Sequence, residues 1–235
     1  MSREKTAMIV APHPDDAELA MGGTIVKLLG AGWALTVVDL TDGEPTPFGT
    51  RQVRAQETEA SNRILGLQHR LCLDMPNRHL EATLANRTGL AEVIRRHRPT
   101  VLFAPLAPDR HPDHTATTEL VDAARFEAKL HKTSLIGEPH WVPRLYHYYT
   151  THGLRYERPS FVVDVTDAWD RKLVAIRAYA SQVEGRAPGT GQSLVDHVEA
   201  VGRYFGLAIG CGYGEPFVSR EPITVQNLDR FDEPA

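Results

Sequence analysis

The amino-acid sequence predicts a three-layer α/β/α fold, in which a mostly parallel sheet carries helices on both faces. The main observation is that short apolar runs of strand length alternate along the chain with longer segments of helical periodicity. The length of 235 residues and the 42% of hydrophobic residues are enough for a substantial buried core. No internal repeat, low-complexity tract or linker interrupts the alternation, so we expect residues 1–235 to form a single domain.

Four strand–helix pairs are predicted in the first part of the chain. The four strands have the sequences "KTAMIVAP", "ALTVVDLT", "HRLCLDM" and "TVLFAPLAP". The first helix, "ELAMGGTIVKLLGAG", ends at Gly30 and Gly32, because glycine readily takes the backbone conformation that ends a helix. A polar helix over residues 51–65 follows the second strand. The helix "RTGLAEVIRRHRP", closed by Pro99, follows the third strand, and a helix that runs to Lys129 follows the fourth.

The second part of the chain is predicted to extend the sheet. Two further strands, "RLYHYYTT" and "SFVVDVT", follow Pro143. Two helices are then expected near residues 167–182 and 192–206.

Composition argues against several classes of protein. The net charge of -4 leaves no basic surplus to neutralise a phosphate backbone, so nucleic acid is not an expected partner. No apolar run approaches the roughly 18 residues of a membrane helix, and the N-terminus lacks the apolar core of a signal peptide. The two cysteines, Cys72 and Cys211, are widely spaced, which predicts reduced, buried thiols and a cytoplasmic location.

Charged residues gather where two of the predicted strands end. The first strand runs into "APHPDDAE" and the fourth into "APLAPDRHPDH", so both deliver a His-Pro-Asp sequence. The carboxyl ends of parallel strands lie at one edge of the sheet, where ligands of such folds bind. We therefore expect the two clusters to meet, with their carboxylates held together by a divalent cation.

The spacing indicates which residues bind that cation. His13 and Asp16 are three residues apart, so a tight turn or a first helical turn places both on one side. His114 supplies a third ligand from the fourth strand end. Two imidazoles and one carboxylate suit zinc, with the fourth position left for water as in catalytic sites. The same ligand set also accepts Fe(II), Co(II) or Mn(II).

The remaining residues of the clusters suggest roles in catalysis. Asp15 lies between two predicted ligands and should point to a different side, where it serves as the general base for a water. His111 precedes His114 by three residues and, as an imidazolium, would stabilise an oxyanion or protonate a leaving amine. Asp113 would hold the His111 ring and keep it charged.

Other residues are interpreted as structural. Glu18 is expected to favour the N-terminus of its helix, and Asp109 to orient its loop. The remaining histidines have no comparable context and are taken as surface or packing residues. A dinucleotide-binding turn is not predicted, because "HPDD" stands where its glycines would be required.

The paired motifs "PHPDDAE" and "HPDH" resemble those of the PIG-L/LmbE family of zinc-dependent N-deacetylases. The resemblance covers nearly the whole chain and implies a Rossmann-like fold that removes acetyl from N-acetylglucosamine-type amines. By position it implies Arg54, in "GTRQVRAQE", as a substrate-contacting arginine. The motif positions match the residues predicted above: the metal ligands His13, Asp16 and His114, the base Asp15, the oxyanion-stabilising His111, and Asp113 beside it.

Within the family, the segments "DMPNRHL", "DRHPDH", "AYASQ" and "GYGEPF" look most like the deacetylases of bacillithiol biosynthesis. That likeness implies an N-acetylglucosaminyl-malate substrate and a hexameric homo-oligomer. The loop "TDGEPTPFGT" and Asn77 depart from the subfamily pattern. Three alternatives stay open: a thiol S-conjugate amidase, a deacetylase of another N-acetyl sugar, and a sugar- or metal-binding protein without catalysis. The presence of both Asp15 and His111 argues against the last, because binding a metal needs neither.

Overall fold

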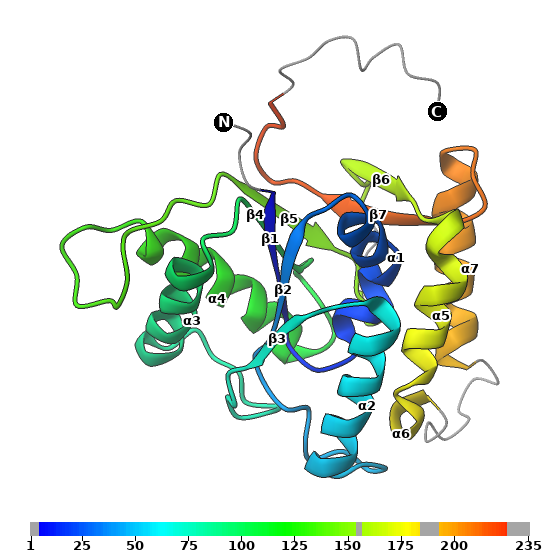
Figure 1. Cartoon of the computed structure of the whole chain (residues 1–235), viewed down its shortest axis with the longest axis horizontal. Coiled ribbons are helices and arrows are strands. Elements are labelled where there is room, and N and C mark those ends of the chain that lie inside the picture. The colour runs from blue at the N-terminus through cyan, green and yellow to red at the C-terminus, as the bar shows by residue number, and fades with distance from the viewer. Residues whose placement is uncertain (1–4, 154–156, 184–192, 225–235) are drawn as a thin grey trace.

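The computed structural model describes residues 5–153, 157–183 and 193–224 (Figure 1). Within these ranges, seven strands form one sheet in the order β3-β2-β1-β4-β5-β7-β6. The bounds of the strands are β1 Thr6–Ala11, β2 Ala34–Asp39, β3 His69–Cys72, β4 Val101–Pro105, β5 Arg144–Tyr148, β6 Phe161–Asp164 and β7 Gly214–Val218.

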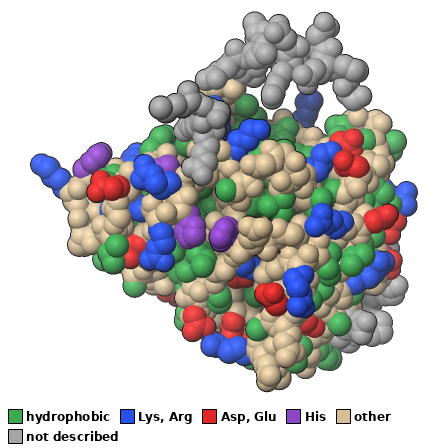
Figure 2. Space-filling model, in the orientation of Figure 1, with side chains coloured by type: hydrophobic (Ala, Val, Ile, Leu, Met, Phe, Trp, Pro, Cys, Tyr) green, Lys and Arg blue, Asp and Glu red, His purple; other side chains and the backbone are tan. Residues whose placement is uncertain are grey.

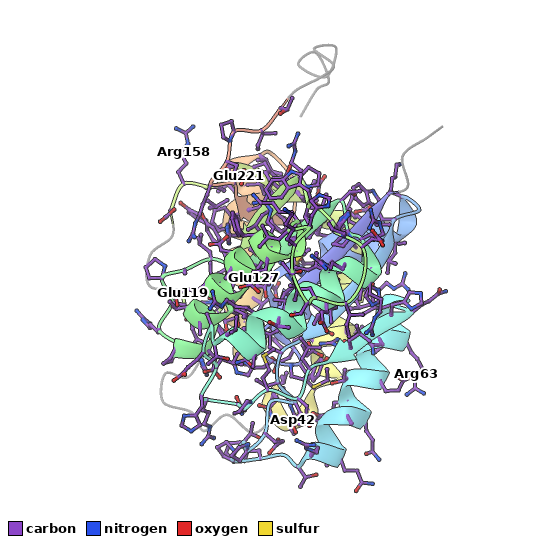
Figure 3. The ribbon with its side chains drawn as sticks, turned by 90° about the vertical axis from the view of Figure 1, so that its left-hand side faces the viewer. Asp42, Arg63, Glu119, Glu127, Arg158 and Glu221 are labelled. Carbon is purple, nitrogen blue, oxygen red and sulfur yellow. The ribbon has the colours of Figure 1, made fainter. Side chains whose placement is uncertain are left out.

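Helices cover both faces of the sheet, which confirms the three-layer prediction (Figure 1). On one face α3 packs against α4, and on the other α5 packs against α1 and α2, with α7 against β7. Arg63 points outward from the helical layer on that second face (Figure 3). The bounds are α1 Asp16–Gly30, α2 Arg51–Leu65, α3 Leu84–His97, α4 Pro112–Ala128, a 3₁₀ turn Thr166–Ala168, α5 Trp169–Arg177, α6 Ala180–Val183 and α7 Leu194–Ala208.

The direction of the strands changes along the sheet. All pairings among β1 to β5 are parallel, whereas β7 runs antiparallel to both β5 and β6. The chain builds outward from β1 to β2 and β3, then crosses back to place β4 on the other side of β1. The carboxyl ends of β1 and β4 therefore form the switch point at which open α/β sheets bind ligands.

Strand β1 shows why the sheet is buried on both faces. Met8 and Val10 pack into the core beneath α3 and α4, whereas Ile9 and Ala11 pack into the core beneath α1. Successive side chains of a strand point to opposite faces, so an apolar residue at every position requires a covering layer on each side.

Two sequence-based expectations differ from the structure. Strand β7 was not predicted, because Gly214 and Pro216 in "GYGEPF" argue against a strand. The proline is tolerated there because β5 pairs only with Phe217 and Val218, so Pro216 lies beyond that pairing.

The thiols are also not buried as expected: Cys72 is exposed on the edge strand β3, and Cys211 is half-buried.

The surface carries charges of both signs. On the face in Figure 2, basic and acidic side chains are intermixed with hydrophobic ones. In the described part of the chain, none of the helices has both the length and the apolar character needed to cross a bilayer.

Candidate metal centre and active site

The two predicted clusters meet at the carboxyl ends of β1 and β4. The turn after β1 leads into α1 at Asp16, and the loop after β4 leads into α4, where Pro112 stands in the first turn. Proline suits that position because its fixed φ is helical and its missing N–H would have no intrahelical partner. The clusters face a cavity of about 190 Å³. It is lined by His13, Asp15, Asp16, Leu19, Gly43, Pro45, Thr46, Arg54, Asn77, Arg78, His111, His114, Thr151, His152, Gln182 and Leu194.

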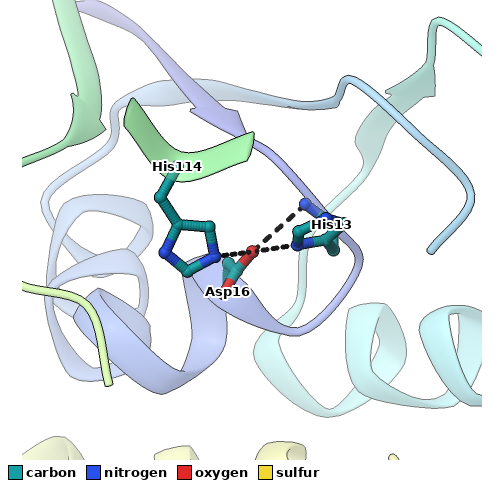
Figure 4. A group of neighbouring side chains, drawn as sticks. All are labelled: His13, Asp16 and His114. Carbon is teal, nitrogen blue, oxygen red and sulfur yellow. Dashed lines mark hydrogen bonds and ion pairs between the residues drawn. The ribbon is translucent and has the colours of Figure 1, made fainter. Parts of the chain in front are cut away.

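The three predicted metal ligands lie together, as Figure 4 shows. The Asp16 Oδ2 atom is 3.0 Å from His13 Nδ1 and 3.4 Å from His114 Nε2. One candidate ligand atom from each residue lies within 4.8 Å of the others. A mixed set of two imidazoles and one carboxylate that opens onto a cavity fits a catalytic zinc or another divalent transition metal.

Each of the two histidines also contacts a second carboxylate. His13 Nε2 is 3.2 Å from Asp113 Oδ2, and His114 Nδ1 is 3.1 Å from Asp109 Oδ2. Each ring thus turns one nitrogen toward Asp16 and the other toward an outer carboxylate. Histidines that bind metals are typically oriented in this way, so the outer contacts support the assignment of the donor set.

The electrostatics of the cluster favour a cation at its centre. Burial alone would lower the pKa of His13, but hydrogen bonds to Asp113 and Asp16 raise it to about 9. Burial would also lower the pKa of His114, but Asp16 and Asp109 outweigh it and raise that pKa to about 10. The carboxylates therefore hold protons on imidazoles that a divalent cation would displace.

Asp15 stands between two ligands with an unusual backbone conformation. Its φ of 107° is in the region that favours glycine, which turns its side chain away from the one that follows it. Burial raises the pKa of Asp15 to about 7, and the Arg54 guanidinium opposes that rise. A carboxylate with such a pKa is suited to accept a proton near neutral pH.

His111 differs from the expected imidazolium. It is the N-cap of α4, and its Nδ1 atom accepts the backbone N–H of Asp113 at 3.2 Å. Burial, followed by the nearby His114 and His13, lowers the pKa of His111 to about 4. The ring is therefore neutral at pH 7, with its proton on Nε2, and its centroid lies 4.8 Å from those of both other histidines. A neutral imidazole at a helix N-terminus can still donate a hydrogen bond to a developing oxyanion.

The expectation that Asp113 holds the His111 ring is wrong for its side chain. The hydrogen bond to that ring comes from the backbone N–H of Asp113, whereas an oxygen of its carboxylate lies within 4.8 Å of a His111 ring nitrogen without bonding to it. The carboxylate turns toward His13 and also accepts the backbone N–H groups of Arg78 at 2.7 Å and Leu80 at 3.2 Å. Asp113 therefore ties the loop after β3 to one of the candidate ligands, a link that no local sequence pattern indicates.

Arg54 lines the cavity but is only 2% exposed. Its Nη1 atom is 3.4 Å from Asp15 Oδ2, and its Nη2 donates to the carbonyl of Pro14. Both Nη atoms are thus directed to the turn after β1, while the Nε–H has no hydrogen-bond partner in the described structure. Contact between Arg54 and a substrate stays a prediction.

Glu18 lies in the first turn of α1, as expected, and it also belongs to a buried polar network beneath the site. Its Oε1 atom accepts hydrogen bonds from Arg70 at 2.6 Å, Ser61 at 3.0 Å and Tyr179 at 3.0 Å. Arg70 also binds Asp39 in a two-point contact. The network joins α1, α2, β2 and β3 below the catalytic turn.

Several cavity residues were missed by sequence reasoning. His152 was taken as a surface or packing residue, but its ring lies 6.0 Å from that of His111 and 5.8 Å from that of His114. Asn77 and Arg78, after β3, and Gln182, in α6, also line the cavity. They fall in the segments "DMPNRHL" and "AYASQ", which carried the subfamily likeness, but no role had been assigned to them. Asp109 also carried a signal, because it stands five residues before a predicted ligand in "DRHPDH".

Comparison with known proteins gives consistent matches. The family model PIG-L, described as GlcNAc-PI de-N-acetylase, matches residues 8–125. A solved structure of the conserved protein TT1542 from Thermus thermophilus is 40% identical, with a TM-score of 0.86 over 94% of this chain and 97% of that one.

Named relatives have diverse substrates. Diacetylchitobiose deacetylase of Thermococcus kodakarensis is 29% identical, covering 90% of this chain and 81% of the relative. A probable N-acetyl-alpha-D-glucosaminyl L-malate deacetylase 2 of Bacillus anthracis is 28% identical, covering 77% and 83%. A 4-oxalmesaconate hydratase of Pseudomonas putida is also 28% identical, covering 76% and 74%. The family match spans half of the chain and includes both polar clusters, so this chain belongs to the PIG-L family.

Proposed function

We propose that this protein is a metal-dependent N-deacetylase that hydrolyses the acetamido group of an N-acetylglucosamine conjugate, giving the free amine and acetate. The observation that carries the proposal is the arrangement around one cavity: a three-residue metal donor set, a carboxylate beside it and a hydrogen-bond donor opposite. Binding alone would need only the donor set, whereas hydrolysis of an amide needs the other two groups. The deacetylase names of several relatives support the same reaction.

Each residue has a role that its position supports. Asp15 accepts a proton from the attacking water, and that proton then passes to the nitrogen of the departing amine as the C–N bond breaks. The His111 Nε2–H donates to the oxygen that becomes negative when water adds to the amide carbon. Asp109 and Asp113 hold the rings of His114 and His13. A bound divalent metal, for which we propose zinc, supplies Lewis acidity toward the carbonyl and lowers the pKa of water.

The finer substrate proposal is a conjugate with an anionic aglycone, such as N-acetylglucosaminyl-malate. Arg54 does not support it, because its guanidinium is buried against Pro14 and Asp15. Arg78 supports the anionic aglycone, because it is exposed and lines the cavity. Its Nη2 atom lies 2.6 Å from the carbonyl oxygen of Pro45, to which it donates. A guanidinium in that place can bind a carboxylate of the aglycone.

The test is an acetate-release and amine-release assay with metal-stripped protein reloaded with zinc. The substrates are diacetylchitobiose, N-acetylglucosaminyl-malate, a neutral alkyl N-acetylglucosaminide and free N-acetylglucosamine. We expect equal amounts of acetate and amine from at least one conjugate, and loss of both activity and bound zinc in Asp16→Ala. Asp122→Asn, a half-exposed residue in α4, is the matched control.

The outcomes separate the alternatives. Release of a larger acid from a thiol conjugate, without acetate from the sugars, would favour the amidase. Hydration of a dicarboxylic substrate without release of amine would favour a hydratase like the relative from Pseudomonas putida. Full zinc content in Asp16→Ala would refute the metal site itself. An Arg78→Ala variant that keeps its preference for the malate conjugate would refute the anionic aglycone site.

We also propose a cytoplasmic location and a homo-oligomer, hexameric by family analogy. Free Cys72 and Cys211 support the reducing compartment, and exposed apolar side chains on α7, such as Tyr204 and Leu207, support self-association. Light scattering of the purified protein measures the assembly directly, and a monomer at micromolar concentration would refute it.

A further inference from the structure

Arg54 occupies a position that local helix energetics do not favour. It lies in the first turn of α2, where the helix dipole favours acidic side chains, yet that turn contains no acid and also holds Arg51. Its side chain is buried, and its Nε–H has no hydrogen-bond partner in the described structure. A residue that breaks a local rule and leaves a buried donor unsatisfied is expected at a functional site.

The guanidinium contacts two consecutive residues of the turn after β1, one through its backbone and the other through its side chain. Nη2 donates to the carbonyl oxygen of Pro14, and Nη1 lies 3.4 Å from the carboxylate of Asp15. The peptide between these residues leads into the positive φ of Asp15, a conformation that persists only when surrounding contacts hold it. The same conformation separates the Asp15 side chain from that of Asp16, which faces the histidines.

The surroundings leave room for the guanidinium and restrain it. Its Cζ atom lies 5.4 Å from the centroid of the Tyr179 ring. On another side stands Gly43, where a Cβ atom would lie 2.9 Å from Nη2 and 3.2 Å from Nε. Glycine is required there because it leaves space for the guanidinium and also because its φ is +78°.

We propose that Arg54 is a positioning residue, which holds the Pro14–Asp15 turn so that the Asp15 carboxylate points into the cavity, a role separate from the substrate clamp that the family resemblance implies. The inference rests on the proposed deacetylase function. The geometry supports it because every polar contact of the guanidinium is made to the turn that carries the base.

Kinetics across substrates of different charge distinguish the two roles. In Arg54→Ala, kcat should fall roughly 10²-fold, by the same factor for the malate conjugate and the neutral alkyl glucosaminide, with KM little changed. Arg54→Lys should recover only part of that loss, because an ammonium cannot contact both groups as a fork does. Added guanidinium should partly restore kcat in Arg54→Ala. Arg51→Ala is the matched control, since Arg51 lies in the same turn but is 69% exposed and pairs with Asp42 and Asp74.

A loss confined to the anionic substrate and expressed in KM would overturn the proposal in favour of the clamp. Should Arg54→Ala fail to fold, the uniform fall of kcat is tested in Arg54→Lys. A crystal structure of the variant gives an answer that does not depend on activity. The φ of Asp15 should leave the positive region when residue 54 is alanine, and an unchanged turn would refute the positioning role. If the wild type released no acetate from any substrate, the proposed function would fail while this structural result still decided the role of Arg54.

Discussion

Replacing Asp109 by asparagine should weaken metal binding without disrupting the fold. The Asp109 side chain is fully buried, and its Oδ2 atom lies 3.1 Å from His114 Nδ1. It also accepts the hydroxyl of Thr150, while Oδ1 accepts the backbone N–H of His111 at 2.7 Å. Asparagine keeps the shape and one acceptor oxygen but removes the charge that orients and polarises the imidazole.

The magnitude follows from the kind of contact that is lost. A hydrogen bond to a charged group contributes about 1.5–3 kcal/mol, which corresponds to roughly 10- to 150-fold in an equilibrium constant. Removal of an outer carboxylate from a metal-binding histidine typically costs about 10- to 100-fold in affinity. We expect Asp109→Asn near the lower end, because its carbonyl still accepts from Nδ1, and Asp109→Ala near the upper end.

A competition titration of zinc against a chromophoric chelator at pH 7 measures this change. The Asp122→Asn variant, in which the altered carboxylate is half-exposed on the same helix as His114, should bind zinc like the wild type. Thermal unfolding of the metal-free proteins shows whether the fold is intact. Unchanged zinc affinity in both Asp109 variants would refute the idea that this carboxylate supports a metal ligand.

Three further variants test the residues around the centre. Asp15→Asn should retain zinc but lose roughly 10²–10⁴ in kcat, as measured by acetate release, and parallel loss of zinc would make Asp15 a ligand. His111→Ala should lower kcat by about 10²–10³ at unchanged zinc content. Its pH profile above pH 6 should keep the wild-type shape, because the His111 ring is already neutral there; a vanished alkaline limb would contradict that. For Glu18, burial raises the pKa but Arg70 outweighs it and lowers the pKa below 4.5. The stability from that pair is therefore complete above pH 4.5 and is lost as the pH falls through the folded-state pKa. Glu18→Gln should reduce the free energy of unfolding at pH 7 by about 3 kcal/mol and flatten its acid dependence, as measured by urea titrations. An equally steep acid dependence in the variant would exclude Glu18 as its source.

The local sequence determined the sheet and the candidate ligands because both depend on short-range patterns. The run Ala7–Ala11 has an apolar side chain at every position, so both faces of this strand need a covering layer whichever elements provide it. Its place in a sheet covered on both faces can therefore be predicted from the sequence. The three-residue spacing of His13 and Asp16 sets their common side within a single turn. The meeting of the β1 and β4 ends could be expected because parallel strands share an edge.

The tertiary structure decided which partner each polar side chain of the site contacts. Asp113 stands two residues from His111 in sequence, yet its carboxylate faces His13, because the start of α4 turns it toward the end of β1. Arg54 reads as an ordinary charge in a polar helix, and only the packing of α2 against the turn after β1 buries it beside Asp15. Spacing along the chain specifies which residues share a turn. It does not specify which of two acceptors a buried donor meets, because that depends on the packing of elements that are distant in sequence.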